Sequence, residues 1–451
     1  MANVIEFDAA AAVAGSVVTE GQTARLFANR YTGRLLFNHD EGRWFLYDGA
    51  IWRKQRKSLV FEWVHKLAVS ISVDAKNSKE LQSSKLARGV ETLVSSYEIF
   101  SRGADQFDPD TFLCGEPNMT VNLRTAEQQS SSPSDMITRS LAVDPADFED
   151  CPMWLEFLDQ ATGGDSDLVL FLQRWCGYCL TGDTREHTLV FVYGGGGNGK
   201  SVMVNTINGI LGDYATIASM NTFTSSKGDK HPTDLAMLRG ARLVTASETE
   251  EGNPWDESRI KQLTGGDLIS ARFMRQDFFT FKPQFKLMII GNHQPVLQNV
   301  DDAIRRRFCM VPFTIKPEKP DPELEAKLRD EWPAILRWMI NGCLDWQKNG
   351  LPRPASVLAA TAEYFEDQDV MSQWLSGECD LDIGNNYKYE RAIDLFNSWT
   401  KYAKSSGIDA GSIKGFSQKL LNRGLTRTVT KAGKRFHGVS LTKTAPTGDG
   451  W

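Results

Sequence analysis

The spacing of apolar residues changes along the chain and separates helical stretches from buried strands. Between Met153 and Leu180 the apolar residues recur at helical spacing, with a break at Gly163-Gly164, which predicts a helical segment. Further on, continuous apolar runs are typical of parallel strands buried on both faces; they occupy 188–193, 242–246 and 286–290. A glycine loop and a helical pattern over 200–211 follow the first run. Because polar residues end each run, we expect an α/β core with a parallel sheet.

The regions beside this core have weaker patterns. Residues 43–52 alternate around Asp48-Gly49, which predicts a β-hairpin. The run 34–37 is too short to assign, and the Gln- and Ser-rich stretch from Glu127 to Asp135 is expected to be a loop or linker. Residues 323–347 have a helical pattern.

The end of the chain predicts a small separate domain. Two helical patterns, Arg391–Ser405 and Ile413–Asn422, precede a strand pair within 426–441, an order that suits a winged helix. The expected fold is therefore an α/β core, preceded by a mostly helical α+β domain and followed by a winged-helix domain. The expected domains are an N-terminal α+β domain (1–150), a helical collar (151–185), the α/β core (186–345), a helical linker (346–384) and the winged helix (385–445).

Composition narrows the setting of the protein. None of the 451 residues lies in an apolar run of eighteen, so no transmembrane helix is expected, and the acidic start of the chain argues against a signal peptide. Seven scattered cysteines suit reduced thiols in a cytosol. Cys176 and Cys179 form one CxxC in an apolar helical stretch, where buried small side chains fit better than a zinc or redox site.

Charge is distributed unevenly, although the net charge is −6. From Gly384 onward there are twelve lysines or arginines and four acidic residues, so this block is about +8 and the remainder about −14. A basic terminal domain on an acidic body indicates a surface for a polyanion. A solvated basic face without a ligand is the alternative.

The glycine loop carries the clearest chemical signal. Residues 194–201 spell GGGGNGKS, a full match to GxxxxGK[ST] between a strand and a helix. Glycines let backbone N–H groups surround phosphates, and the helix directs its positive end at them. Lys200 is expected to reach the β- and γ-phosphates of ATP, and Ser201 to hold Mg²⁺. The expected nucleotide-binding residues are Gly194, Gly195, Gly196, Gly197, Asn198, Gly199, Lys200, Ser201 and Val202.

Further along the core, three kinds of side chain fit phosphoryl transfer. Glu248 follows the second strand and is the preferred carboxylate for the magnesium shell and for activating water, with Glu250 and Glu251 as alternatives. Asn292 follows the third strand and is a candidate to orient the water, although asparagine is also common in turns. One arginine of 305–307 is a candidate finger for a neighbouring subunit, with a surface basic run as the alternative.

These motifs resemble superfamily 3 helicases, specifically the phage and plasmid primase-helicase family related to poxvirus helicase-primases. The segments that carry the resemblance are 231–236, 238–242, 246–252, 261–267, 271–272, 281–286, 292–295, Arg307 and 312–313. Weaker resemblance extends over 151–178, the region from Trp44 to Trp52 and the terminal block around Trp399 and Phe416.

The resemblance implies an AAA+ motor that assembles as a ring, usually a hexamer, with ATP between subunits. It assigns to the nucleotide and its magnesium Lys200, Ser201, Glu248 and Asn292. By position it favours Arg307 as the finger and Arg306 second, but Arg305 stands where the family often has an aromatic residue, so the choice stays open. The primase that the family often carries has no room in this sequence, so the resemblance is to the helicase part alone.

DNA contacts are expected in two places. Residues 269–281 have two apolar arms around a polar tip, which predicts a hairpin, and superfamily 3 rings project a hairpin from this region into the pore. The candidates for phosphate contacts there are Arg272, Arg275 and Lys282, with structural ion pairs as the alternative. The candidates in the terminal domain, which could equally bind protein, are Lys414, Lys434 and Arg435. The helical spacing of the domain's aromatic residues places them in its core: Phe396, Trp399, Tyr402 and Phe416.

Three functions follow from these observations. The first is an ATP-dependent DNA helicase that replicates a phage, prophage or plasmid in the cytoplasm of a bacterial or archaeal cell. It would translocate on single-stranded or forked DNA as a ring, with a separate primase or polymerase as a partner. The second is an ATP-gated origin binder or loader that recruits a primase without unwinding. The third is an ATPase used in defence against mobile elements.

Overall fold

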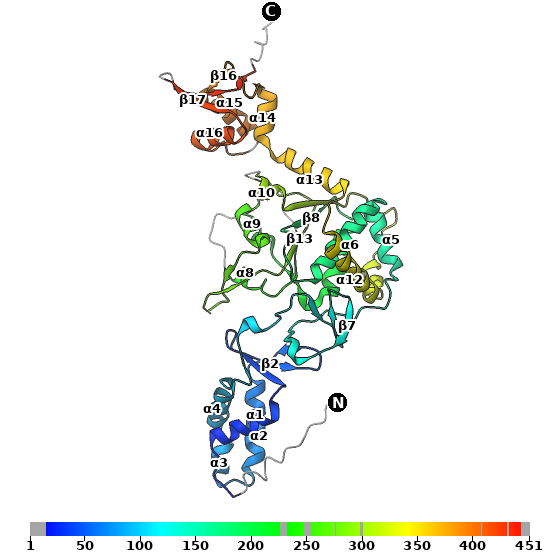
Figure 1. Ribbon diagram of the computed structural model, residues 1–451, viewed down its shortest axis with the longest axis vertical. Coiled ribbons are helices and arrows are strands. Elements are labelled where there is room, and N and C mark those ends of the chain that lie inside the picture. The colour runs from blue at the N-terminus through cyan, green and yellow to red at the C-terminus, as the bar shows by residue number, and fades with distance from the viewer. Residues whose placement is uncertain are drawn as a thin grey trace, which may run out of the picture. The chain divides into compact units, whose positions relative to one another are not determined.

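The computed structural model describes residues 15–225, 232–247, 254–275, 277–297, 301–406, 408–430 and 433–442 (Figure 1). By its internal contacts the chain forms two compact units, the first made of 1–295 with 307–357 and the second of 296–306 with 358–451. The predicted N-terminal domain, collar and most of the α/β core therefore share one unit. The predicted linker, 346–384, is divided between the two units.

The first unit begins with helices packed on a small sheet. The helices are α1 (Glu20–Tyr31), α2 (Leu59–Ser72), α3 (Ser78–Leu81) and α4 (Ser84–Ser95), and the strands are β1 (Leu35–Asn38), β2 (Arg43–Tyr47), β3 (Trp52–Lys54) and β4 (Ser101–Arg102). The strand order is β3-β2-β1-β4. Strands β2 and β3 confirm the predicted hairpin, whose turn is held by Asp48 Oδ1 accepting from the backbone N–H groups of Ala50 and Ile51 at 2.9 and 2.8 Å.

A second small sheet follows, and it corrects one prediction. Its strands, in the order β5-β6-β7, are β5 (Leu113–Gly115), β6 (Met119–Asn122) and β7 (Glu127–Ser130). The expected loop over 127–135 is wrong at its first four residues, because they form β7. All four side chains of β7 are exposed, so backbone pairing with β6 holds the strand. A strand without a buried face has no apolar alternation, which is why the sequence pattern did not reveal it.

The helical pattern predicted between Met153 and Leu180 is confirmed as α5 (Pro152–Thr162) and α6 (Ser166–Leu180). Helix α5 ends at Gly163, whose φ of 69° lies in the left-handed region that glycine adopts without strain. Helix α6 begins at Asp165, whose side chain accepts a hydrogen bond from the backbone N–H of Leu168 at 3.0 Å. The glycine pair therefore separates two helices, as the sequence indicated.

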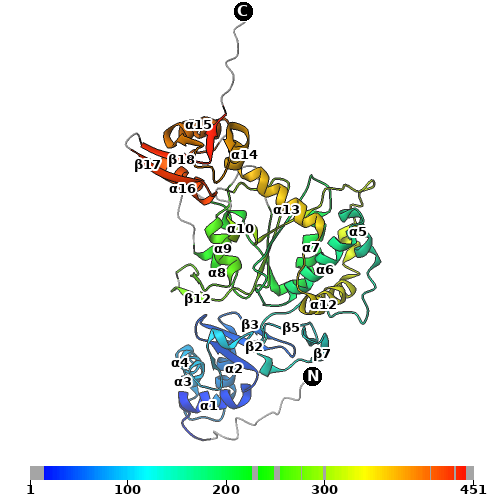
Figure 2. The ribbon, with the colours of Figure 1, turned by 45° about the horizontal axis from the view of Figure 1, so that its top comes forward.

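A five-stranded parallel sheet forms the centre of the first unit. Its strands are β8 (Leu189–Tyr193), β9 (Ala215–Ile217), β10 (Leu243–Ser247), β13 (Lys286–Gly291) and β14 (Phe308–Pro312), in the order β14-β8-β13-β10-β9. The helices beside it are α7 (Lys200–Leu211), α8 (Thr233–Ala236), α9 (Glu257–Gly265), α11 (Leu324–Leu328) and α12 (Trp332–Asn349). Figure 2 shows α8 and α9 on one side of this sheet and α6, α7 and α12 on the other. The three predicted strands and the helix over 200–211 are confirmed, and β9 and β14 extend the sheet.

Two buried cations lie at the starts of neighbouring central strands. Arg242, before β10, donates to the backbone oxygens of Leu113 and Leu180, and its guanidinium lies 4.3 Å from the centre of the Tyr214 ring. Lys286, at the start of β13, donates from Nζ to the backbone oxygen of Thr181. These bonds connect the sheet to β5 and to the end of α6. Burial also lowers the pKa of Lys286 to about 7.

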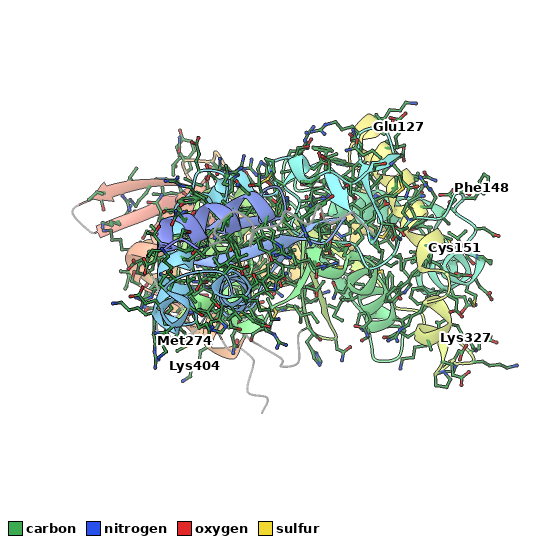
Figure 3. All side chains as sticks on the ribbon, turned by 90° about the horizontal axis from the view of Figure 1, so that it is seen from below. Glu127, Phe148, Cys151, Met274, Lys327 and Lys404 are labelled. Atoms are coloured by element: carbon green, nitrogen blue, oxygen red, sulfur yellow. The ribbon has the colours of Figure 1, made fainter. Side chains whose placement is uncertain are left out.

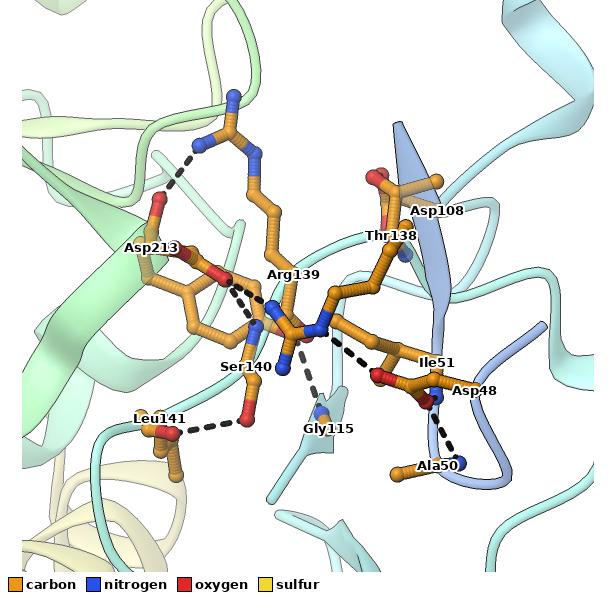
Figure 4. A network of polar contacts seen from close by, with 12 residues as sticks. Asp48, Ala50, Ile51, Asp108, Gly115, Thr138, Arg139, Ser140, Leu141 and Asp213 are labelled. Atoms are coloured by element: carbon orange, nitrogen blue, oxygen red, sulfur yellow. Dashed lines mark hydrogen bonds and ion pairs between the residues drawn. The ribbon is translucent and has the colours of Figure 1, made fainter. Parts of the chain in front are cut away.

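The opposite end of α7 meets the N-terminal hairpin through a polar network (Figure 4). Asp213 Oδ2 accepts from the backbone N–H of Ser140 at 3.2 Å and from Arg53 Nη1 at 3.4 Å, and Arg53 Nε is 2.7 Å from Asp48. Arg139 donates to the backbone oxygen of Asp213. The Arg53–Asp213 ion pair is half exposed and contributes little to stability. The hydrogen bonds to backbone groups therefore hold these segments together.

The second unit contains the predicted terminal domain. Its helices are α10 (Asp302–Arg305), α13 (Ala355–Gln368), whose first turn belongs to the first unit, α14 (Val370–Glu378), α15 (Ala392–Ser405) and α16 (Ile413–Asn422). Its strands are β15 (Cys379–Leu381), β16 (Tyr389–Arg391), β17 (Thr426–Thr430), β18 (Gly433–His437) and β19 (Val439–Leu441). They form a β16-β18-β17 sheet and a β15-β19 pair. Trp399 and Phe416 are buried in the core and Phe396 and Tyr402 pack against it, as expected, but Trp374 of α14 joins them, so the domain begins before residue 385.

Replacing Lys286 should change how stability depends on pH. The folded-state pKa of about 7 lies below the usual value near 10.4, so between those pH values the unfolded chain holds the extra proton. The free energy of unfolding therefore gains about 1.4 kcal/mol per pH unit from this group as pH rises across that window. In Lys286→Met this contribution should disappear, as measured by urea unfolding at pH 7, 8 and 9. Lys85→Met, at an exposed site on α4, is the control, and a profile for Lys286→Met that parallels the wild type would contradict the expectation.

Candidate phosphate-binding site

The glycine loop runs from the end of β8 to the start of α7, as the motif predicts. Gly194 has φ of 153°, and a Cβ atom there would overlap the backbone oxygen of Phe313. Gly199 has φ of 83°, and a Cβ atom there would lie 2.6 Å from the Phe157 ring of α5. A Cβ atom at Gly196 would meet nothing within 4 Å. The loop therefore requires glycine at its two ends, where other parts of the fold approach the backbone closely.

Lys200 fills the inside of this loop. Its side chain is 7% exposed, and Nζ donates to the backbone oxygens of Gly194 and Gly195 at 2.7 and 3.1 Å. Nζ also donates to Asn198 Oδ1 at 2.8 Å and to Asn292 Oδ1 at 3.1 Å. Burial lowers the pKa of Lys200 below its ordinary value. Within the described residues the ammonium group is thus partnered by neutral oxygens, and an anion in the loop would stabilise its charged form.

A cavity of about 340 Å³ opens over the loop. It is lined by Gly196, Gly197, Asn198, Gly199, Lys200, Ser201, Val202, Ser247, Ile290, Gly291 and Asn292. The exposed Ser201 lies in the first turn of α7, where backbone N–H groups have no partner within the helix. A cavity lined by free N–H groups, a hydroxyl and an ammonium is suited to an anion.

The strand order explains why Asn292 reaches this cavity. Strand β13 lies between β8, which carries the loop, and β10, which ends at Ser247. Since all three strands are parallel, their carboxyl ends lie at the same edge. Glu248 is the next residue after β10, and it lies outside the described residues, as do its alternatives Glu250 and Glu251.

A second, more apolar cavity of about 510 Å³ adjoins the loop and was not predicted. It shares Gly197, Asn198, Gly199 and Val202 with the first cavity. Phe157 of α5 and Ile315 and Pro320, which follow β14, supply much of its apolar wall. These side chains come from segments far apart in the sequence, and the match to the loop motif contains no signal for them.

The three consecutive arginines have different environments. Arg305 and Arg306 are exposed, and the guanidinium of Arg305 lies 5.0 Å from the centre of the Phe365 ring. Arg307 is only 9% exposed, and its Nε donates to Thr264 Oγ1 at 3.1 Å. Its position is fixed by the neighbouring β14, where its backbone oxygen accepts from Leu189. The Arg307 side chain is thus buried and bonded within the chain, whereas those of Arg305 and Arg306 are exposed.

The predicted hairpin over 269–281 is present as β11 (Ile269–Ala271) and β12 (Phe279–Phe281). Its expected DNA contacts, Arg272, Arg275 and Lys282, are all exposed. Arg275 has φ of 61°, as expected at a tight turn, and Arg272 lies 4.8 Å from the centre of the Phe278 ring. Met274, labelled in Figure 3, is 70% exposed beside them. The hairpin therefore presents two arginines and apolar side chains together at its end.

The expected DNA contacts of the terminal domain do not form one cluster. Lys414 is exposed in the first turn of α16. Lys434 and Arg435 are neighbours on β18, so strand alternation directs them to opposite faces of the sheet. Arg435 shares its face with Tyr389 of β16, 4.6 Å from guanidinium carbon to ring centre, and the sequence analysis did not single out this tyrosine.

The cysteines are all buried free thiols, in agreement with the sequence analysis. Burial raises the pKa of Cys176 well above its ordinary value and that of Cys179 to about 12. In the described part of the chain no group of three or more His, Cys, Asp or Glu side chains is arranged to hold a metal ion. None of the helices described there is long and apolar enough to cross a bilayer.

Two family models match this chain. The first, described as D5 N terminal like, matches residues 24–163, and a family of unknown function, DUF5906, matches 192–307. For the solved structure of the NrS-1 C-terminal region, the TM-score is 0.53 with 11% identity, over 93% of this chain and 98% of that chain. That likeness shows a shared mixed α/β fold with a parallel sheet and helices.

The curated relatives are viral proteins. "Putative helicase L207/L206" of Acanthamoeba polyphaga mimivirus is 24% identical over 73% of this chain and 37% of that protein. "Putative helicase 022R" of Frog virus 3 is 25% identical over 58% and 29%, and "Putative primase C962R" of African swine fever virus is 22% identical over 39% and 19%. The chain thus spans less than two fifths of the length of each of these relatives. They come from eukaryotic viruses, and they lend no support to the expected bacterial or archaeal host.

The matches thus include viral proteins named putative helicases and a putative primase, and a solved structure that shares the mixed α/β fold. The D5 N terminal like match over residues 24–163 and these viral relatives make the chain similar to proteins of the primase-helicase kind.

A methyl group at Gly194 should weaken phosphate binding. Gly194→Ala places Cβ against the Phe313 backbone oxygen, so the loop must open and its N–H groups lose their alignment. We expect ATP affinity to fall by about tenfold or more, measured by competition with a fluorescent nucleotide. Gly196→Ala, with open space around its Cβ, should bind like the wild type. Equal affinity of the two variants would refute this account of the loop.

Proposed function

We propose that this chain is an ATP-dependent DNA helicase with an AAA+ core, which works as a ring, as a hexamer, on single-stranded and forked DNA. One observation carries the proposal: Lys200 Nζ lies inside the glycine loop and 3.1 Å from Asn292 Oδ1, which follows the neighbouring strand β13. A phosphate-binding lysine and a polar side chain that can contact the γ-phosphate or its attacking water thus converge in one cavity.

The residues at the loop fit the triphosphate of ATP. The glycines at its ends keep out side chains, the first turn of α7 supplies N–H donors, and Lys200 supplies a cation. The four neutral oxygens that now accept from Lys200 are weaker partners for an ammonium than phosphate oxygens. Bound ATP supplies a phosphoryl group whose transfer to water releases free energy. We assign its nucleoside to the apolar cavity beside Phe157, Ile315 and Pro320, which opens from the same loop.

Magnesium is assigned to Ser201 and to a carboxylate that follows β10. The Ser201 hydroxyl is exposed in the cavity, and Ser247 places the end of β10 in the same cavity. Glu248 remains the preferred carboxylate, both for the magnesium shell and for accepting the proton of the attacking water. Asn292 would hold that water through its side-chain amide.

A ring brings an arginine from one subunit to the nucleotide of the next. We assign this part to Arg306, because Arg307 is buried and bonded to Thr264 within its own subunit. The hairpin with Arg272 and Arg275 would contact the phosphates of the translocating strand, and Lys282 is the third candidate. A separate primase or polymerase is the expected partner. The names of the viral relatives support the helicase assignment.

Removing the loop lysine tests the motor. Lys200→Ala should lower ATP hydrolysis at least a hundredfold, because the cation that neutralises the phosphates is lost. Separation of a forked duplex should be abolished, as measured by release of a labelled strand. Lys85→Ala on α4 should retain both activities. Unwinding that survives Lys200→Ala would contradict the proposal, and wild-type hydrolysis with origin binding but without unwinding would identify a loader.

The two arginines should fail in different ways. Arg306→Ala should keep wild-type stability and ATP binding but lose hydrolysis. Mixing Arg306→Ala subunits with Lys200→Ala subunits should restore part of the hydrolysis, because some interfaces then combine an intact Lys200 with an intact Arg306. Arg307→Ala should instead lower the free energy of unfolding by about 2 kcal/mol, because a buried side chain and its bond to Thr264 are lost. If Arg307→Ala instead lost hydrolysis at wild-type stability while Arg306→Ala lost stability, Arg307 would be the arginine that acts on the neighbouring nucleotide.

A further inference from the structure

One face of the β16-β18-β17 sheet in the second unit is covered neither by its own core nor by other described side chains of that unit. Strand register defines this face. Tyr389 pairs with His437, and Arg391 pairs with Arg435, while Thr426 and Thr428 lie across from His437 and Arg435 on the other side. Phe436, between His437 and Arg435, points the other way and is fully buried in the domain core. We call the surface formed by Tyr389, Arg391, Arg435, His437, Thr426 and Thr428 the open sheet face.

Two exposed tyrosines lie at or next to this face. Tyr389 on the face is 46% exposed, and Tyr387, in the turn before β16, is 95% exposed. Most other aromatic residues of the domain lie in its core or pack against it, among them Trp374, Trp399 and Phe416. Leaving two tyrosine rings in water sacrifices the free energy that their burial would contribute, so a ligand that covers them is favoured.

The cation on the open sheet face has an unused hydrogen-bond donor. The guanidinium of Arg435 lies over the Tyr389 ring at 4.6 Å, and its Nε is shielded from water without a hydrogen-bond partner in the described part of the chain. By contrast, Arg391 is paired with Asp394, at 3.0 Å from Nη2 to Oδ1, and Lys388 is paired with Asp380 at 2.5 Å. Among the described residues, Arg435 is therefore the cation of this face that has no ion pair.

The remaining polar groups hold the face in one shape. His437 bonds through Nε2 to Thr428 Oγ1 at 2.8 Å and through Nδ1 to the backbone oxygen of Asn386 at 2.7 Å. Its ring centre lies 5.9 Å from that of Tyr389. The tyrosine, histidine and arginine are thus already ordered beside one another, so binding would lose little conformational entropy.

We propose that the open sheet face binds single-stranded DNA, with bases stacked on Tyr389 and Tyr387 and a backbone phosphate held by Arg435. An exposed ring stacks on an unpaired base, whereas the bases of a duplex are already stacked inside it. The site is separate from Lys414 on α16 and from Lys434, which points to the other face of the sheet. It rests on the proposed function only in taking DNA as the polymer, because it needs neither ATP nor ring assembly.

The test is a binding titration of the full chain without nucleotide. A fluorescent oligothymidylate and a blunt duplex of equal length are titrated in the Arg275→Ala background, which removes one motor contact and exposes the contribution of this face. Tyr389→Ala and Arg435→Ala should each weaken single-strand binding about tenfold, and Tyr389→Phe should restore the wild-type affinity. Arg435→Ala should also reduce the slope of log K against log salt by about 0.7, the value for one phosphate contact on a single strand.

Arg427→Ala, which removes a charge on the opposite face of the same sheet, is the matched control and should have little effect. Photocrosslinking with a bromodeoxyuridine oligonucleotide should label Tyr389 or Tyr387. The proposal is overturned if Tyr389→Ala binds the single strand as its parent does, or if Tyr389→Ala weakens duplex binding as strongly as single-strand binding. A wild-type chain that neither hydrolyses ATP nor unwinds a fork would count against the helicase proposal alone, because this binding measurement involves neither activity.

Discussion

The close approach of the backbone around the glycine loop is the constraint on which the rest of the site depends. Gly194 lies against the backbone oxygen of Phe313, and Gly199 lies against the Phe157 ring. Asn198 donates to the same Phe313 oxygen, so the loop is tied to the end of β14 as well as to β8. Only this tight path places Lys200 inside the loop, where its ammonium meets Asn292 from the next strand. A loop of looser geometry would leave the ammonium in water.

The collar helices extend this constraint beyond the sheet. Helix α5 supplies Phe157 to the loop and to the apolar cavity beside it, and Gly163 at its end lies against Ile315, which lines the same cavity. The N-terminal hairpin and β5 reach the sheet through Asp213 and Arg242. The segments before the glycine motif are therefore part of the structure that shapes the loop and the two cavities beside it.

The two proposed DNA surfaces use different physical means. The hairpin of the first unit presents Arg272 and Arg275, which suit contacts with phosphates of any sequence. The open sheet face combines exposed tyrosine rings with one available guanidinium, which suits unpaired bases. The two surfaces would serve a helicase in different ways. The hairpin would contact the phosphate backbone, and the open sheet face would bind the single strand after separation.

The sequence by itself determined the elements whose patterns are local. The buried runs, the helix after Gly199 and the break at Gly163 were predicted because periodicity and glycine conformation depend on near neighbours. Tertiary structure alone decided which distant groups meet. The strand order placed Asn292 next to Lys200, and the pairing of β14 with β8 left Arg307, which precedes β14, buried. Backbone pairing with β6 formed β7, although its side chains have no apolar pattern. The register of β16 on β18 likewise put Tyr389 beside Arg435. These outcomes depend on contacts between residues far apart in the chain, and no local pattern records them.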